Sequence, residues 1–214
     1  MNMNTKRSVA KALLDIGAVG FSPAAPITFK SGIRSPVYVD NRALIYHPRA
    51  WHVVVDGFRA LLEAGGVDFD IIAGVAVGGV PHSSALAYIL QKPSVFVRKE
   101  EKAHGKGQRI EGGDVRGKRV LLVEDLVTTG GSSLSAVDAL RTAGARVTDV
   151  AAIISYGFSA ASNAFASAGL ALHTLTEFTA VLDEAQARGA LDEAQLAAVR
   201  RWFADPYNWE SEDK

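Results

Sequence analysis

The chain has 214 residues, and 48% of them are hydrophobic, which is enough for one sizeable core. Its 23 basic and 23 acidic residues cancel, so we expect neither nucleic acid nor an anionic membrane as a partner. The sequence contains no cysteine, which excludes disulfides and thiolate metal sites and fits the cytoplasmic location that we expect.

The first predicted element is an amphipathic helix that carries Val9, Leu13 and Ile16 on one face. This stripe differs from the apolar core of a signal peptide, and no later stretch is apolar for long enough to cross a bilayer. Residues 27–32 and 35–40 follow as two short strands joined by a turn. They predict a hairpin at one end of the domain.

Beyond the hairpin, apolar strands and helical segments alternate along the chain. The predicted strands are residues 71–77, 95–97, 120–123 and 147–154. The predicted helices are residues 49–63, 81–90, a helix that begins near Leu134, 177–188, and 192–203 with a capping box of Asp192 and Gln195. This alternation indicates an α/β fold with a central, mostly parallel sheet and helices on both faces. We expect a single domain over residues 1–214, in which residues 1–45 form an N-terminal helix and a small hood hairpin, and residues 46–214 form the core and the C-terminal helices.

Residues 119–133 combine a buried strand, an acidic pair and a Gly/Thr/Ser turn. The apolar run ends at Glu124 and Asp125, and ligands of open α/β sheets bind at the carboxyl ends of such strands. The turn fits neither a Walker A loop nor the Rossmann G-x-G-x-x-G pattern. Its backbone N–H groups, next to a helix that a serine could cap, can face a phosphate. Since two carboxylates would repel phosphate, we expect them to accept hydrogen bonds from ribose hydroxyls while the turn holds a 5-phosphate. The alternative is an ordinary strand-turn-helix with surface carboxylates.

A polar loop of residues 99–114 joins two of the predicted strands. Compact domains rarely carry a loop of this length without a function. Its basic side chains could neutralise a pyrophosphate, and its glycines could let it close over a substrate. By composition alone, a solvated hairpin of mixed charge fits the loop equally well.

Three segments resemble those of known enzymes. Residues 119–133 are similar to the motif with which type I phosphoribosyltransferases bind 5-phosphoribosyl 1-diphosphate (PRPP): a hydrophobic strand, two acidic residues and a Thr/Gly-rich loop. Residues 29–36 resemble the Lys-Ser-Gly-x-x-Ser-Pro segment of the orotate phosphoribosyltransferase family. The Arg-Lys-x-x-Lys-x-His signature of that family is matched by Arg98, Lys99, Lys102 and His104. The resemblance extends over nearly the whole chain.

The resemblance implies a type I phosphoribosyltransferase fold and Mg²⁺-dependent transfer of the phosphoribosyl group from PRPP to N1 of orotate. The products would be orotidine 5-monophosphate and pyrophosphate, in pyrimidine biosynthesis. Catalytic roles are implied for Lys102 and Asp125, and orotate binding for Lys30 and Thr128. The residues implied in PRPP binding are Arg98, Lys99, Lys102, His104, Glu124, Asp125, Leu126, Val127, Thr128, Thr129, Gly130, Gly131 and Ser132.

The resemblance also implies a homodimer with shared active sites, because in this family the basic loop reaches into the site of the neighbouring subunit. Mg²⁺ would be bound by the pyrophosphate and ribose oxygens of the substrate. We therefore predict no metal ligand from the protein.

The chain departs from the family pattern at three places. Glu124 stands where Asp is commoner, a change that still leaves a carboxylate for a ribose hydroxyl. Residues 155–158, Ser-Tyr-Gly-Phe, lack the arginine that contacts orotate in some members, so Thr128, backbone N–H groups and Lys30 are expected to carry more of that recognition. Residues 73–81 lack a lysine that some members carry at the pyrophosphate loop.

Two other functions could use the same PRPP motif. A phosphoribosyltransferase for another base, such as a purine, is disfavoured by the Lys30 segment together with the basic signature of residues 98–104. A PRPP-sensing regulator that binds nucleic acid would need a basic face or an added DNA-binding module, and the sequence shows neither.

Overall fold

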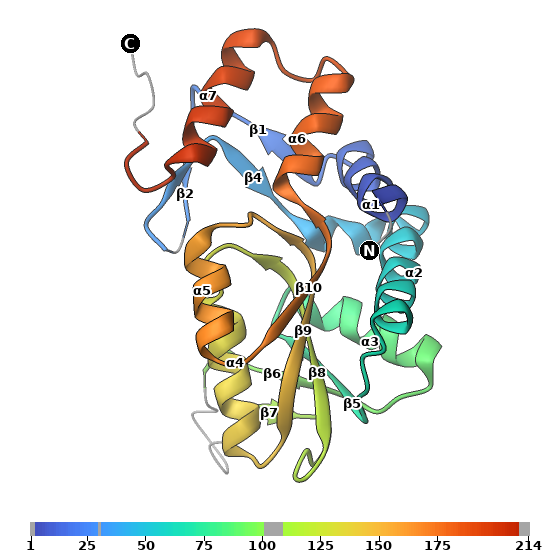
Figure 1. The fold of residues 1–214 in the computed structure, drawn as a ribbon. Helices are drawn as coiled ribbons and strands as arrows, with labels where there is room; N and C mark the ends of the chain where they lie inside the picture. Colours follow the sequence, from blue (N-terminus) through green and yellow to red (C-terminus); the bar gives the residue numbers. More distant parts are fainter. Residues whose placement is uncertain (1–2, 30, 101–108, 210–214) are drawn as a thin grey trace.

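The computed structural model describes residues 3–29, 31–100 and 109–209. A six-stranded sheet with the strand order β10-β9-β8-β5-β6-β7 forms its centre (Figure 1). The strands are β5 (Ile71–Val75), β6 (Ser94–Val97), β7 (Ile110–Glu111), β8 (Arg119–Val127), β9 (Arg146–Ser155) and β10 (Ala171–Glu177). Neighbouring strands are parallel except for the antiparallel pair of β6 and β7 at one edge. The predicted α/β architecture with a mostly parallel sheet is confirmed.

Helices cover both faces of the sheet (Figure 1). One face carries α1 (Met3–Asp15), α2 (Pro48–Gly65) and α3 (Gly79–Leu90), and the other carries α4 (Gly131–Thr142) and α5 (Ser159–Ser167). Strand β8 serves both cores, because successive side chains of a strand point to opposite faces. Leu121 and Val123 pack in the α1–α3 core, whereas Val120 and Leu122 pack in the α4–α5 core. This double burial explains the continuous apolar run that identifies the strand in the sequence.

A hood lies at the end of the sheet where β10 runs into α6 (Figure 1). In it, β1 (Val19–Phe21) pairs antiparallel with β4 (Val37–Val39), and β2 (Ile27–Thr28) with β3 (Arg34–Ser35). The helices α6 (Phe178–Ala187) and α7 (Glu193–Ala204) lie in the same region. The indole Nε1 of Trp202 donates a hydrogen bond of 2.8 Å to the carbonyl of Arg34, which ties α7 to the hood strands.

The predicted single hairpin of residues 27–32 and 35–40 is wrong in its pairing. Pro36 divides the second predicted strand, because proline has no N–H group for a strand ladder. The part before Pro36 pairs with β2, and the part after it pairs with β1, a strand that the sequence does not predict.

The sequence also fails to predict β7, β10, α5 and a 3₁₀ helix at Asn41–Tyr46. Helix α5 buries mainly Ala161 and Phe165, so its apolar stripe is faint in the sequence. The capping box of α7 is confirmed: Asp192 accepts from the backbone N–H of Gln195 at 2.7 Å, and the Gln195 side chain accepts from Asp192 N–H at 3.1 Å. Within the described ranges, no helix has the length and apolar character needed to span a membrane.

Candidate active site

Strands β5 and β8 are neighbours in the sheet, and the chain leaves them in opposite directions. After β5 it passes through α3 to β6, and after β8 it passes through α4 to β9. Ligands of open α/β sheets bind at such a reversal, where free N–H groups at helix N-termini attract anions. The predicted acidic pair lies at this point of the sheet.

Strand β8 continues beyond the end of β5. The β5 ladder ends with Gly74 opposite Val123, whereas β9 pairs with β8 as far as Val127. The prediction that the strand ends at Val123 is therefore wrong, because pairing with β9 carries it through the acidic pair. The start of α3 replaces β5 here: a Cβ atom on Gly79 would overlap the carbonyl oxygen of Val123.

Glu124 points into the interior and is only 4% exposed. Its Oε1 accepts from the backbone N–H of Asp125 at 3.1 Å, and its Oε2 accepts from the hydroxyl of Ser133 at 3.3 Å. Burial, and next the neighbouring Asp125 carboxyl, raise the pKa of Glu124 well above its ordinary value. Glu124 therefore links β8 to the first turn of α4, and its contact with ribose stays a prediction.

Asp125 is half-buried and directs its carboxylate toward the start of α3. A Cβ atom on Gly78 would overlap both carboxylate oxygens, so the glycine leaves room for the side chain in this orientation. On the backbone side, the Asp125 carbonyl accepts a hydrogen bond of 2.7 Å from Nδ2 of Asn41. Asp125 is thus the member of the acidic pair that is placed to meet a ligand.

The turn after β8 leads directly into α4. Gly130 is the N-cap with φ +86°, and no side chain in the described part of the chain caps this helix. The prediction of a serine-capped helix that begins near Leu134 is wrong, because Ser133 uses its hydroxyl on Glu124 and α4 begins at Gly131. Thr128 and Thr129 are half-buried, and Gly131 and Ser132 are exposed. The uncapped helix start leaves N–H groups available for an anion.

Leu126 and Val127 belong to the predicted PRPP site but differ in exposure. Val127 is buried in the α4–α5 core, and its carbonyl accepts the N–H of Tyr156 at 3.0 Å. Leu126 is half-buried and packs against the opposite core. Neither side chain carries a polar group, so these residues can offer a phosphorylated ligand only backbone or apolar contacts.

Arg98 and Lys99 follow β6 and therefore lie at the same edge of the sheet as the acidic pair. Arg98 is half-buried and forms an ion pair of 3.3 Å with Glu111 of β7. Arg109 donates to the Arg98 carbonyl at 2.9 Å and to the Ser135 carbonyl of α4 at 3.1 Å. Lys99 is exposed. The other predicted basic residues, Lys30, Lys102 and His104, lie outside the described residues.

An aromatic cluster joins the hood to the end of β9. The ring of Phe29, next to Lys30 in sequence, lies 5.5 Å from the ring of Tyr156 and 6.3 Å from that of Trp202. Tyr156 also stacks on Phe158 with a centroid distance of 5.4 Å. The structure therefore brings the predicted orotate segment close to residues 155–158, the place where the sequence lacks an arginine.

Two buried polar residues beside Asp125 are missed by sequence reasoning. Asn41 is 1% exposed and His82 is fully buried. Asn41 holds the Asp125 backbone, and the negative charge of Asp125 acts on His82. A histidine in the first turn of a helix that carries no charged residue is the signal that could have identified His82.

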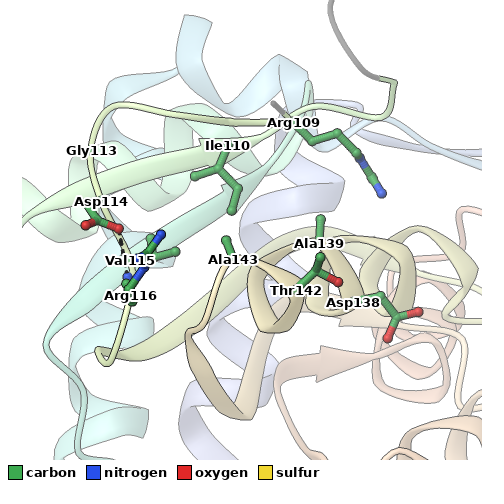
Figure 2. A pocket seen from close by; sticks show the side chains of 10 residues that line it. All are labelled: Arg109, Ile110, Gly113, Asp114, Val115, Arg116, Asp138, Ala139, Thr142 and Ala143. Atoms are coloured by element: carbon green, nitrogen blue, oxygen red, sulfur yellow. Dashed lines mark hydrogen bonds between the residues drawn. The ribbon is translucent and has the colours of Figure 1, made fainter. Parts of the chain in front are cut away.

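A cavity of about 710 Å³ lies between residues 109–116 and the C-terminal half of α4 (Figure 2). Arg109 and Arg116 line it together with Asp114 and Asp138, so its charge is mixed. None of the predicted site residues lines this cavity. It is therefore separate from the acidic pair and the turn after β8.

Comparisons with known proteins identify a domain family and relatives that this chain resembles. The model of the phosphoribosyl transferase domain matches residues 33–163. The orotate phosphoribosyltransferase of Bacillus caldolyticus is 41% identical over 206 residues, which cover 96% of this chain and 100% of the relative. The UMP synthase of Leishmania donovani superposes with a TM-score of 0.81 at 29% identity; the match covers 93% of this chain and 42% of the synthase. The orotate phosphoribosyltransferase of Mycobacterium tuberculosis, solved in complex with PRPP, gives a TM-score of 0.63 at 28% identity and covers 83% of this chain and 98% of that one.

Proposed function

This chain belongs to the orotate phosphoribosyltransferases, and we propose that residues 124–132 form its site for the phosphoribosyl group of PRPP. The enzyme transfers this group to orotate, a step of pyrimidine biosynthesis. The observation that carries the site assignment is the reversal between β5 and β8, where the Asp125 carboxylate and the uncapped start of α4 lie together. The matched domain includes all of these residues.

The 5-phosphate is held by the turn of residues 128–132. The left-handed backbone at Gly130 and the absence of a capping side chain in the described structure let successive N–H groups converge on one anion. The hydroxyls of Thr128 and Thr129 add donors at the same turn. This arrangement binds phosphate without a buried cation.

Asp125 accepts a hydrogen bond from a ribose hydroxyl or from a metal-bound water. The described residues contain no cluster of three or more His, Cys, Asp or Glu side chains that could hold a metal ion. The Asp125 carboxylate can hold a water on Mg²⁺, whereas the Glu124 carboxyl is engaged in the interior. Pyrophosphate and ribose oxygens of the substrate would bind the Mg²⁺, which would supply Lewis-acid activation of the leaving group.

The reaction breaks the bond between C1 of the ribose and the pyrophosphate oxygen, forms the bond from C1 to N1 of orotate, and releases the N1 proton of orotate to the departing pyrophosphate or to water. Because C1 becomes cation-like and the departing pyrophosphate gains negative charge, the protein must stabilise the leaving group. We assign this to the backbone at Gly78 and Gly79 and to the basic residues Arg98, Lys99, Lys102 and His104. Loss of one such contact costs about 10²–10³ in rate. Lys102 is the proposed catalytic cation.

Orotate recognition is assigned to Lys30 and Thr128. Phe29 anchors the neighbouring segment on Tyr156, at the end of β9. If Lys30 binds the orotate carboxylate, Lys30→Ala should raise the KM for orotate more than the KM for PRPP. Equal KM values for orotate in the variant and the wild type would refute the assignment.

The protein is proposed to be a homodimer in which Lys102 acts in the site of the neighbouring subunit. Mixing denatured Lys102→Ala and Asp125→Asn chains and refolding them together tests this directly. Mixed dimers would contain one site with both substitutions and one intact site, so recovery of about a quarter of wild-type activity is expected. No recovery, with dimers formed normally, would place both residues in the same subunit's site.

The function is tested by the loss of orotate ultraviolet absorbance after addition of enzyme, PRPP and Mg²⁺. We expect rapid consumption by the wild type and a loss of about 10²–10³ in Lys102→Ala. Uracil, adenine, guanine, hypoxanthine and xanthine serve as control bases. Consumption of one of these bases instead of orotate would overturn the proposal.

A further inference from the structure

His82 is a fully buried histidine on the first turns of α3, outside the residues assigned above. Its Nδ1 lies 3.0 Å from the indole Nε1 of Trp51 in α2, and the two rings meet edge to face. Burial lowers the pKa of His82 to about 4, against the opposing effect of the Asp125 charge. His82 is therefore neutral near pH 7.

The contact with Trp51 fixes which ring nitrogen carries the proton. The indole N–H can only donate, so Nδ1 must accept and the proton of the neutral ring resides on Nε2. In the described structure, Nε2 is buried and has no hydrogen-bond partner. A buried donor without an acceptor costs about 1–3 kcal/mol, so this N–H group needs an acceptor when the site is in use.

Asp125 is the acceptor that the geometry offers. Its carboxylate rests against Gly78, the N-cap of α3, and His82 lies four residues further along, on the same side of the helix. Asp125 is also the charged group whose field acts on His82. Asn41 and Glu124 already engage the backbone carbonyl and N–H of Asp125. The Asp125 carboxylate contacts the Glu124 carboxyl on one side, and His82 would hold it from the side of α3.

We propose that His82 is a positioning residue for Asp125: its Nε2–H donates to the Asp125 carboxylate, directly or through one buried water. Trp51 enforces the tautomer that makes this possible. This inference rests on the proposed role of Asp125 in binding ribose. Through Trp51 and His82, helices α2 and α3 then help to orient the ribose of PRPP.

Steady-state kinetics with three variants test the proposal. His82→Leu removes the donor at similar volume, and His82→Gln keeps an N–H group near the position of Nε2. Trp51→Phe removes the hydrogen bond that fixes the tautomer together with part of the indole ring. We expect kcat/KM for PRPP to fall about tenfold in His82→Leu, to recover largely in His82→Gln, and to fall less in Trp51→Phe. In an Asp125→Asn background, His82→Leu should cause little further loss.

A purely structural histidine gives a different pattern. His82→Leu would then lower Tm but leave kcat/KM for PRPP unchanged at temperatures well below Tm, and this result would overturn the proposal. Orotate turnover by the wild type is measured first, so failure of the proposed function is recognised separately.

Heteronuclear NMR of histidine-labelled protein gives a second readout that does not depend on turnover. We expect His82 to show a protonated Nε2 and a bare Nδ1. Addition of PRPP alone should shift the Nε2–H signal in the wild type but not in Asp125→Asn. A proton on Nδ1, or a signal that PRPP leaves unchanged in the wild type, would refute the assignment.

Discussion

Gly130→Ala is the substitution whose cost the structure defines most sharply. Gly130 has φ +86°, a left-handed conformation that costs an alanine about 1–2 kcal/mol. A Cβ atom there would also lie 2.7 Å from Cε2 and 3.3 Å from Cδ2 of Phe165, a ring that is 2% exposed and fixed in the α4–α5 core. Such overpacking costs about 1–3 kcal/mol. Together these effects predict a loss of about 2–5 kcal/mol in the free energy of unfolding.

Urea unfolding followed by circular dichroism measures this loss, and two variants separate its parts. Gly117 has φ +72°, and a Cβ atom added there would have no neighbour within 4 Å, so Gly117→Ala reports backbone strain alone. Phe165→Leu shrinks the side chain that the added methyl group would meet, so the double substitution G130A/F165L should cost less than the sum of the two single changes.

Gly130→Ala should also raise the KM for PRPP, since the turn of residues 128–132 would shift to relieve the contact. If Gly130→Ala destabilises the protein no more than Gly117→Ala, and the double variant shows simple additivity, the close approach of Phe165 to the turn is refuted. A stable variant with unchanged KM would additionally remove the turn from the proposed phosphate site.

Three further substitutions have effects that can be stated briefly. The pKa of His82 is about 4 in the folded protein and 6.5 ordinarily, so the unfolded chain binds the proton first as the pH falls. The free energy of unfolding should therefore drop by about 3 kcal/mol between pH 6.5 and pH 4. His82→Gln should flatten this part of the plot of unfolding free energy, measured with urea, against pH. Parallel profiles would contradict the buried neutral ring. Ser133→Ala removes the hydroxyl donor of Glu124 and should cost about 1–3 kcal/mol by the same assay. Trp202→Phe removes the indole N–H that donates to the Arg34 carbonyl, so it should lower Tm and reduce the free energy of unfolding by about 1–3 kcal/mol; an unchanged Tm would contradict this link.

The sequence is sufficient to predict the core of the fold because strong local signals mark it. The apolar run ending at Val123 is buried on both faces, and the capping box at Asp192 forms as expected. Elements that depend on their partners are missed. Strand β10 is an edge strand with polar residues along it. Strand β1 can be recognised only from its pairing with β4, the strand that follows Pro36.

The same limit applies to the site. Glu124 and Asp125 are adjacent carboxylates in the sequence, and nothing local distinguishes their roles. Their other contacts differ: Glu124 reaches Ser133 in the interior and Asp125 reaches Gly78, while the two carboxyl groups remain in contact with each other. In the sequence, Ser133 is likewise interpreted as a helix cap, whereas in the structure its hydroxyl donates to Glu124. The position of His82 depends on how α2 and α3 pack together, so it cannot be predicted from any single segment of the sequence.

These placements also explain how an anion can bind beside an acidic pair. Burial raises the pKa of Glu124 and lowers that of His82, so both side chains are shifted toward their neutral forms. The stability that Glu124 contributes as a neutral acid is present at low pH and is lost as the pH rises through its folded pKa, whereas His82 has the opposite dependence. The raised pKa of Glu124 lowers the negative charge next to the start of α4. In the proposed site, the carboxylate of Asp125 then faces the ribose hydroxyls and the start of α4 holds the phosphate.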